Sequence, residues 1–193
     1  MSADAILQVT NAFRTRLETA LAKSTVPGTV FVGPLDDADA SGAALVLFLY
    51  RIVPNPTLRN REHTVPNPAP LPHVVFRNSL PLDLYFLVTV GTVPNASEEI
   101  LLKALGFAMQ EIQNDPELAG PAVNFQTVHL SLEPLTTEES SRIWALFPTA
   151  NYRTSIAYCA TPVWIDPPQA PPIIQPVVDD QIRVGVKTGE AVS

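Results

Sequence analysis

Apolar residues recur at helical spacing in two long segments of the chain. In residues 3–23, which no proline interrupts, the apolar stripe consists of Ile6, Val9, Phe13, Leu17, Ala20 and Leu21. In residues 98–113 the stripe consists of Leu101, Leu105, Ala108 and Ile112, and Pro116 follows. Glu98 and Glu99 fall in the first turn of the second segment, where carboxylates suit the positive end of a helix. The pattern therefore predicts two amphipathic helices.

Other segments are rich in β-branched and aromatic residues and predict strands. They are residues 29–32, 44–53, 81–90, 127–132 and 154–165. Segment 44–53 is apolar on both faces, which is typical of a central strand with cover on both sides. We predict that 44–53 and 81–90 are neighbours in one sheet on which both helices pack. A capping box at Thr136–Glu139 predicts a further short helix with its apolar residues inward.

A proline-rich stretch separates these two strands. Residues 54–78 contain six prolines. Since proline lacks a backbone donor and restricts the residue before it, we predict an extended excursion rather than a folded subdomain. The stretch is locally basic in an acidic chain, with Arg51, Arg59, Arg61 and Arg77. We interpret it as an interaction loop with these arginines as contact candidates; a merely flexible loop is the alternative.

Two other segments are candidates for contacts with a partner. Arg153, at the start of the last strand, either anchors a partner carboxylate or is simply solvated. After residue 166 the composition changes, with five prolines between 167 and 176. We therefore divide the chain into a domain, 1–166, and a proline-rich tether with a C-terminal arm, 167–193. The alternating Ile182, Val184 and Val186 would add a strand to an exposed sheet edge; a frayed terminus is the alternative.

Composition limits the kinds of partner. Charged residues are 16% of the chain, below the roughly 25% usual for soluble domains, so we expect part of the surface to be an interface. A net charge of −7 argues against nucleic acid. The longest apolar run, residues 43–50, is far shorter than the roughly 20 residues of a spanning helix. The N-terminal residues lack the pattern of a signal peptide. We expect a cytoplasmic protein that does not insert into membranes.

Catalytic chemistry has little support in the sequence. His63, His73 and His129 show no zinc-type spacing and are interpreted as ordinary surface histidines, with the lone Cys159 in the core. Glycine-rich phosphate loops and nucleophile elbows do not occur. We predict no metal, no cofactor and no enzymatic activity. From these residues alone the sequence indicates an α/β domain of open function.

Five segments in consistent order, within residues 5–166, resemble a known family. They are LVLFLYRIVPNPTLRN (45–60), PLDLYFLVTVG (81–91), the helix around Leu102–Gly106, LSLEPLTTEESSRIWALF (130–147) and YRTSIAYCATPVWID (152–166). The family comprises cap, or tail-terminator, components of contractile injection systems of the antifeeding-prophage and virulence-cassette type. The tail after residue 166 carries none of the resemblance.

The resemblance implies a mixed, mainly antiparallel sheet flanked by helices, as in phage tail terminators. It also implies a homohexameric ring that ends the inner tube, holds the last sheath layer and catalyses nothing. Two other hypotheses are an adaptor or scaffold that does not assemble, and a hydrolase whose pocket would join Ser155, a histidine and a carboxylate. The first would be a monomer in solution.

Overall fold

The computed structural model describes residues 3–65 and 74–168. Its helices are α1 (Ala5–Ser24), α2 (Glu98–Asn114) and α3 (Thr137–Trp144), with single 3₁₀ turns η1 (Ala38–Ala40) and η2 (Pro121–Val123). Its strands are β1 (Thr29–Val32), β2 (Ala43–Pro54), β3 (His63–Val65), β4 (Val74–Phe76), β5 (Leu80–Val90), β6 (Glu117–Leu118), β7 (Val128–Glu133) and β8 (Ser155–Ile165). The predicted helices and strands of the domain all form, with ends shifted by a few residues at most.

Six strands form one sheet in the order β1-β2-β5-β8-β7-β6. Only β1 and β2 are parallel; every other pair in this sheet is antiparallel. Strands β2 and β5 are neighbours, with Leu45 opposite Val90 and Pro54 opposite Leu82. The predicted fold class, a mixed and mainly antiparallel sheet with helices, is therefore confirmed, and so is the predicted pairing of these two strands.

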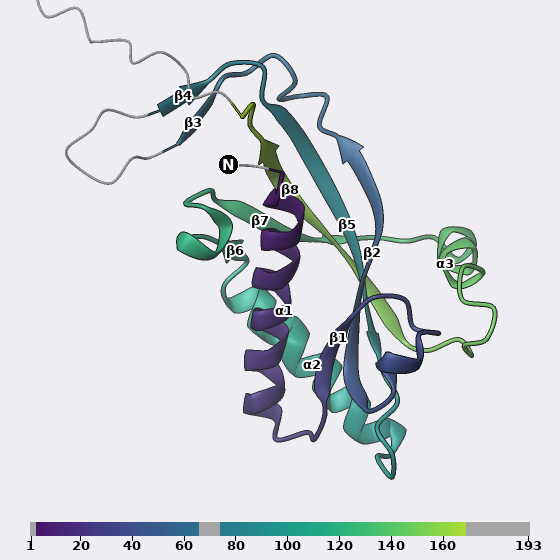
Figure 1. Cartoon of the computed structure of the whole chain (residues 1–193). Coiled ribbons are helices and arrows are strands. Elements are labelled where there is room, and N and C mark those ends of the chain that lie inside the picture. Colours follow the sequence, from purple (N-terminus) through teal and green to yellow (C-terminus); the bar gives the residue numbers. More distant parts are fainter. Residues whose placement is uncertain (1–2, 66–73, 169–193) are drawn as a thin grey trace, which may run out of the picture.

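The main core lies on one face of the sheet, under α1 and α2, which also contact each other (Figure 1). Alternate residues of β5, namely Leu82, Leu84, Phe86, Val88 and Val90, point into this core, as period-two alternation predicts. From α1, Phe13 is fully buried and packs edge-on against Phe86 and Tyr158, with ring centroids 5.4 and 5.8 Å apart. Both long helices therefore pack on the sheet as predicted.

The opposite face is covered differently from what the sequence suggested. The sequence predicted cover on both sides of β2, and apolar side chains from α3 supply part of it on this face. Both long helices lie on the other face. The second, smaller core consists of Leu87 with Ile143, Trp144 and Phe147 from α3 and the turn after it. Since α3 has only eight residues, it covers only part of this face. The rest of this face, along the outer halves of β2, β5 and β8, has no helix over it in the described ranges.

The proline-rich stretch is also more ordered than predicted. Strands β3 and β4 pair antiparallel as a small separate sheet, so part of residues 54–78 is a hairpin rather than an extended excursion. Asn55 begins the stretch with its side-chain oxygen accepting from the N–H groups of Thr57 and Leu58 at 3.0 and 3.1 Å. This turn uses no backbone N–H group of a proline as a donor, so it can form next to the prolines.

Gly91 sets the closest backbone approach in the core. Its N–H donates to the carbonyl oxygen of Ala44 at 2.9 Å, and a Cβ atom at Gly91 would overlap the carbonyl oxygen of Ala43. We predict that Gly91→Ala lowers the free energy of unfolding by about 2–4 kcal/mol, because a backbone atom cannot yield as a flexible side chain does. Urea unfolding followed by tryptophan fluorescence measures the change.

Gly106 provides the matched control. It lies within α2, and a Cβ atom there would meet nothing within 4 Å. Gly106→Ala should raise stability by about 0.5–1 kcal/mol, since alanine is the better helix former. Equal stability of Gly91→Ala and the wild type would contradict the packing described here.

Candidate protein-interaction surface

The candidate site lies on the sheet at the margin of the cover that α3 provides. Tyr50, Arg51, Tyr85 and Glu133 gather here, on the face opposite α1 and α2. An irregularity in the β2–β5 register between Leu49 and Arg51 brings Arg51 opposite Tyr85. The Arg51 side chain is exposed, whereas Tyr50, Tyr85 and Glu133 are half-buried. We refer to this group of four residues as the outer-face cluster.

Aromatic rings support the arginine of the outer-face cluster. The guanidinium carbon of Arg51 lies 5.2 Å from the ring centroid of Tyr85, a cation–π distance, and the rings of Tyr50 and Tyr85 are 6.2 Å apart. Glu139 and Arg142 of α3 line a depression together with Arg51 and Glu133. Positive and negative groups thus face one open hollow, which suits recognition of another protein rather than of a highly charged polymer.

Burial raises the pKa of the tyrosines in this cluster and of the nearby Cys159. Burial, with a smaller contribution from Glu133, raises the pKa of Tyr50 to about 12. Burial also raises the pKa of Tyr85, and it raises the pKa of Cys159 to about 11. At neutral pH the two phenols therefore keep their protons and can donate hydrogen bonds.

The other arginines of the proline-rich stretch lie at the surface. Arg59 and Arg61 are exposed and make no ion pair with any residue of the described ranges. Arg77 pairs with Glu62 at 3.2 Å across the β3–β4 hairpin. Both partners are more than half exposed, and such a pair typically contributes little to stability. The structure therefore leaves these arginines accessible but does not bring them into the outer-face cluster.

Arg153 lies elsewhere and already has partners within the chain. Its guanidinium donates to the carbonyl oxygen of Gly91 at 2.9 Å and lies 4.0 Å from the Glu98 carboxylate. It thereby joins the end of β5 to the beginning of α2. Its contact with a partner stays a prediction, as do those of Ile182, Val184 and Val186, which lie outside the described residues.

A buried polar cluster at the base of the hairpin was missed by the sequence reasoning. His63 is 7% exposed, so its interpretation as a surface histidine was wrong. Its Nδ1 lies 2.6 Å from Oδ1 of Asp166, and the Ser79 hydroxyl donates to the same oxygen at 2.8 Å. The imidazole also stacks on Trp164, with centroids 4.7 Å apart. The only sequence signal was a histidine within a β-rich segment, His63–Val65.

This cluster contains the residue types of a serine hydrolase but not their arrangement. In such an enzyme the serine contacts the histidine, whereas here Ser79 and His63 both contact Asp166. Ser155, the serine considered from the sequence, accepts a hydrogen bond from the indole nitrogen of Trp144 at 3.3 Å. The cluster therefore serves to fasten the β3–β4 hairpin to the end of β8.

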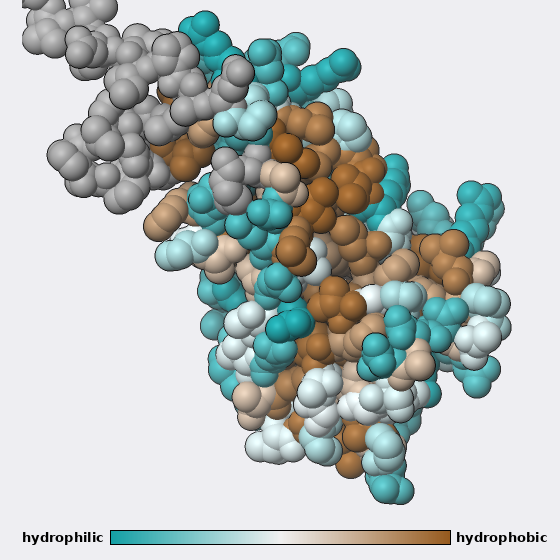
Figure 2. All heavy atoms as spheres, viewed as in Figure 1, coloured by the Kyte–Doolittle hydropathy of each residue, from teal (hydrophilic) through white to brown (hydrophobic). Residues whose placement is uncertain are grey.

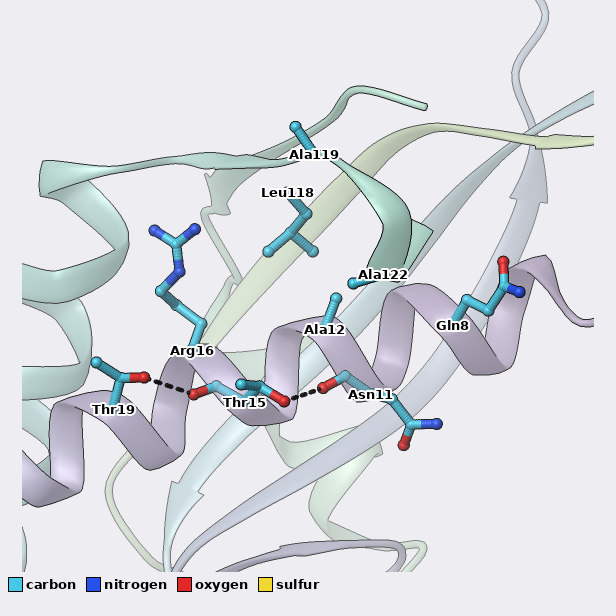
Figure 3. Close-up of a pocket in the computed structure, with 9 residues that line it drawn as sticks. All are labelled: Gln8, Asn11, Ala12, Thr15, Arg16, Thr19, Leu118, Ala119 and Ala122. Carbon is cyan, nitrogen blue, oxygen red and sulfur yellow. Dashed lines mark hydrogen bonds between the residues drawn. The ribbon is translucent and has the colours of Figure 1, made fainter. Parts of the chain in front are cut away.

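A groove along α1 offers no better catalytic site. Figure 3 shows Arg16 and Ala12 of α1 pointing to the side on which Leu118, Ala119 and Ala122 lie. Arg16 donates to the carbonyl oxygens of Asp115 and Glu117 at 2.6 and 3.1 Å, so it is engaged in holding the chain after α2. Thr15 and Thr19 donate to carbonyl oxygens one turn earlier in α1. These contacts stabilise packing and leave no nucleophile or base in the groove.

The described ranges hold neither a cluster of metal ligands nor a helix that could span a membrane. In residues 3–65 and 74–168, no three His, Cys, Asp or Glu side chains gather as ligands for a metal ion. Among the helices of the same ranges, none combines the length and the apolarity that a membrane span needs.

The surface between α1 and β5 exposes apolar area (Figure 2). On it, Ile52 of β2 and Leu80 of β5 are 45% and 44% exposed. Protein contacts would bury such area.

Two solved structures share this architecture. A sheath/tube terminator of an extracellular contractile injection system, the PVC in its extended state, matches with a TM-score of 0.60 and 15% identity. The match covers 97% of this chain and 65% of that one. The tube-terminating cap of the anti-feeding prophage matches with a TM-score of 0.60 and 18% identity, over 91% of this chain and 60% of that one. This chain thus spans less than two thirds of either protein.

The domain therefore has the fold found in tube terminators of contractile injection systems. The chain belongs to the family of the Pvc16 N-terminal domain, whose sequence model matches residues 8–179. The family resemblance noted in the sequence is thereby confirmed. The match continues past residue 166, so the position of the boundary between domain and arm stays a prediction. No curated protein sequence matches the chain.

The His63 cluster leads to a stability prediction. His63→Ala should lower the free energy of unfolding by about 1–3 kcal/mol, because it leaves the buried Asp166 carboxylate without this partner. The environment of Trp164 should change as well, which tryptophan fluorescence reports. His129, exposed on β7, is the control, and His129→Ala should stay within about 0.5 kcal/mol of the wild type. Equal effects of the two substitutions would show that His63 is not a fastening residue.

Proposed function

We propose that this protein is a structural cap of a phage-tail-like contractile injection system. In this role it ends the inner tube, anchors the last sheath layer and catalyses nothing. The observation that carries the proposal is membership of the Pvc16 N-terminal domain family, together with a fold shared with two tube terminators.

The proposed assembly is a homohexameric ring. A ring built from one repeated contact closes on itself and so matches the symmetry of a tube built of rings. It must bind the layer below it and present to the next layer a surface that does not bind. The outer-face cluster and the exposed apolar residues of β2 and β5 are the surfaces that support self-contact and tube contact here.

Charge makes specific contacts necessary. Each copy has a formal net charge of −7, so copies in a ring repel one another at long range. Apolar area and placed arginines have to overcome this repulsion at the contacts. Arg51, supported by Tyr85 and exposed beside the acidic Glu133, is the described arginine best placed to meet a carboxylate of a neighbour.

Native mass measurement of the purified full chain is the first test. A monomer has a mass of 20.9 kDa, and we expect a ring whose mass corresponds to six copies. A monomer at every concentration, alone and with tube and sheath proteins, would favour the adaptor hypothesis instead.

Electron microscopy of particles assembled without the chain provides the second test. We expect tubes and sheaths of uncontrolled length, corrected by adding the chain back. We expect assembly to take place in the cytoplasm.

Arg51 provides a residue-level prediction. Arg51→Glu should weaken ring formation at least about tenfold, which corresponds to about 1.4 kcal/mol per contact. Analytical ultracentrifugation over a concentration series measures the effect, which should weaken at high salt. Lys103, exposed on α2, provides a control with the same change of charge. If Lys103→Glu weakens the ring equally, the effect is one of net charge and the outer-face cluster is not the contact.

A further inference from the structure

Strand β7 has an edge that is only partly paired. Its partner β6 has two residues and pairs only with Val128 and His129. The Leu130 N–H donates to the carbonyl oxygen of Pro116 at 2.7 Å, so Leu130 turns its backbone groups toward the β6 side. Because backbone direction alternates along a strand, Leu132 turns its N–H and carbonyl to the same side. No strand of the described ranges pairs with Leu132 on this side.

An apolar groove runs beside this open edge. It lies between α2 and β7, with a volume of about 470 Å³, and its lining includes Met109, Pro116, Leu130, Leu132 and Tyr158. Leu132 is 51% exposed and Met109 is 38% exposed, which is unusual for large apolar residues facing each other. Burial raises the pKa of Tyr158 to about 12, so the floor of the groove is uncharged at neutral pH.

The opposite face of the same edge carries two carboxylates. Leu130 points into the main core, so Ser131 and Glu133 point to the other face of the sheet. Glu117, which pairs with His129, adds a second carboxylate on that face. A segment that completes this edge should therefore have apolar residues at alternate positions, for the groove, and basic residues between them, for the carboxylates.

Residues 181–187 of this chain have that pattern. In Gln181-Ile182-Arg183-Val184-Gly185-Val186-Lys187, the apolar residues alternate with Arg183 and Lys187. We propose that this segment of a neighbouring copy adds a strand to the β7 edge, with Ile182, Val184 and Val186 in the groove beside α2. Main-chain hydrogen bonds to Leu132 provide affinity, and the alternating side chains determine the register. The proposal rests on the self-assembly put forward above.

The geometry favours a neighbour over the same copy. Leu132 pairs with Tyr158, seven residues before the end of β8 at Ile165, or about 23 Å back along the strand. Docking on the same copy would require residues 167–180 to turn back along β8, whereas the five prolines of this linker favour continued extension. The twelve residues between 168 and 181 span about 40 Å when extended, which is enough to reach an adjacent subunit.

Cysteine pairing in the full-length protein tests the contact. One copy carries Leu132→Cys and an affinity tag, and a co-expressed second copy carries Val184→Cys. After mild oxidation, we expect disulfide-linked pairs of tagged and untagged chains, since two cysteines pair only when their Cα atoms lie within about 7 Å. The same experiment with Ile182→Cys or Val186→Cys allows for a shift of register by two residues. The native Cys159 is buried and gives the same background throughout.

Arg183→Cys is the matched control. It lies in the same segment but points to the opposite face, so it should link at least about fivefold less than the best of the three apolar positions. Equal linking at Arg183 and at those positions would show random encounter and overturn the proposal. A single chain that carries both Leu132→Cys and Val184→Cys is oxidised in parallel. Linking within that chain, with none between the two copies, would overturn the docking on a neighbour.

The native mass of the wild type, measured in parallel, separates this inference from the proposed function. A hexamer without selective linking overturns the strand contact and leaves the cap function standing. A monomer contradicts the cap function and removes the neighbour contact with it.

Val184→Asp should weaken the ring about tenfold or more, whereas Val177→Asp, outside the segment, should not. If the two variants form rings of equal stability, the docking is contradicted.

Discussion

The packing of Phe13 in α1 against Phe86 and Tyr158 is the contact around which this structure is arranged. These rings come from a helix and from two neighbouring strands, β5 and β8, that lie 72 residues apart in sequence at this point. Their edge-on contacts fix α1 over the centre of the sheet, and α2 then packs beside α1. With both long helices on one face, the fold leaves the outer halves of three strands uncovered. The candidate surface follows from this one-sided core.

The one-sided core also agrees with the composition. A chain with few charged residues that buries only one face of its sheet fully must leave apolar and aromatic side chains near solvent. Tyr50 and Tyr85 on the outer face, and Ile52 and Leu80 on the other, are of this kind. Such surfaces are costly in a monomer and useful in a component that is surrounded by copies and partners. These exposed side chains therefore support the proposed assembly.

Much of this fold could be predicted from the sequence because it depends on local periodicity. The spacing of Phe13 and Leu17 and the alternation from Leu82 to Val90 indicated which residues are buried. Periodicity does not indicate which face of a sheet a helix covers, so the one-sided arrangement was not predicted. The buried His63 was missed for a similar reason. Its partner Asp166 lies 103 residues away, and no local pattern connects them. Arg51 is exposed, and its contact with a partner stays a prediction. Its support by Tyr85 depends on an irregularity of register that the sequence does not reveal.

The edges of the sheet are consistent with a component that ends a polymer. Long open edges invite further strands and so lead to continued growth. Here one edge is β1, with four residues, and the other is β6, with two, so neither offers a long template. The open part of β7 is also short, because Pro134 follows Glu133 directly and cannot donate to an added strand. An edge of this length accepts one short segment, whose side chains fill the groove. No open edge then remains here for a further strand. Limited pairing of this kind lets a subunit join a ring without starting a fibre.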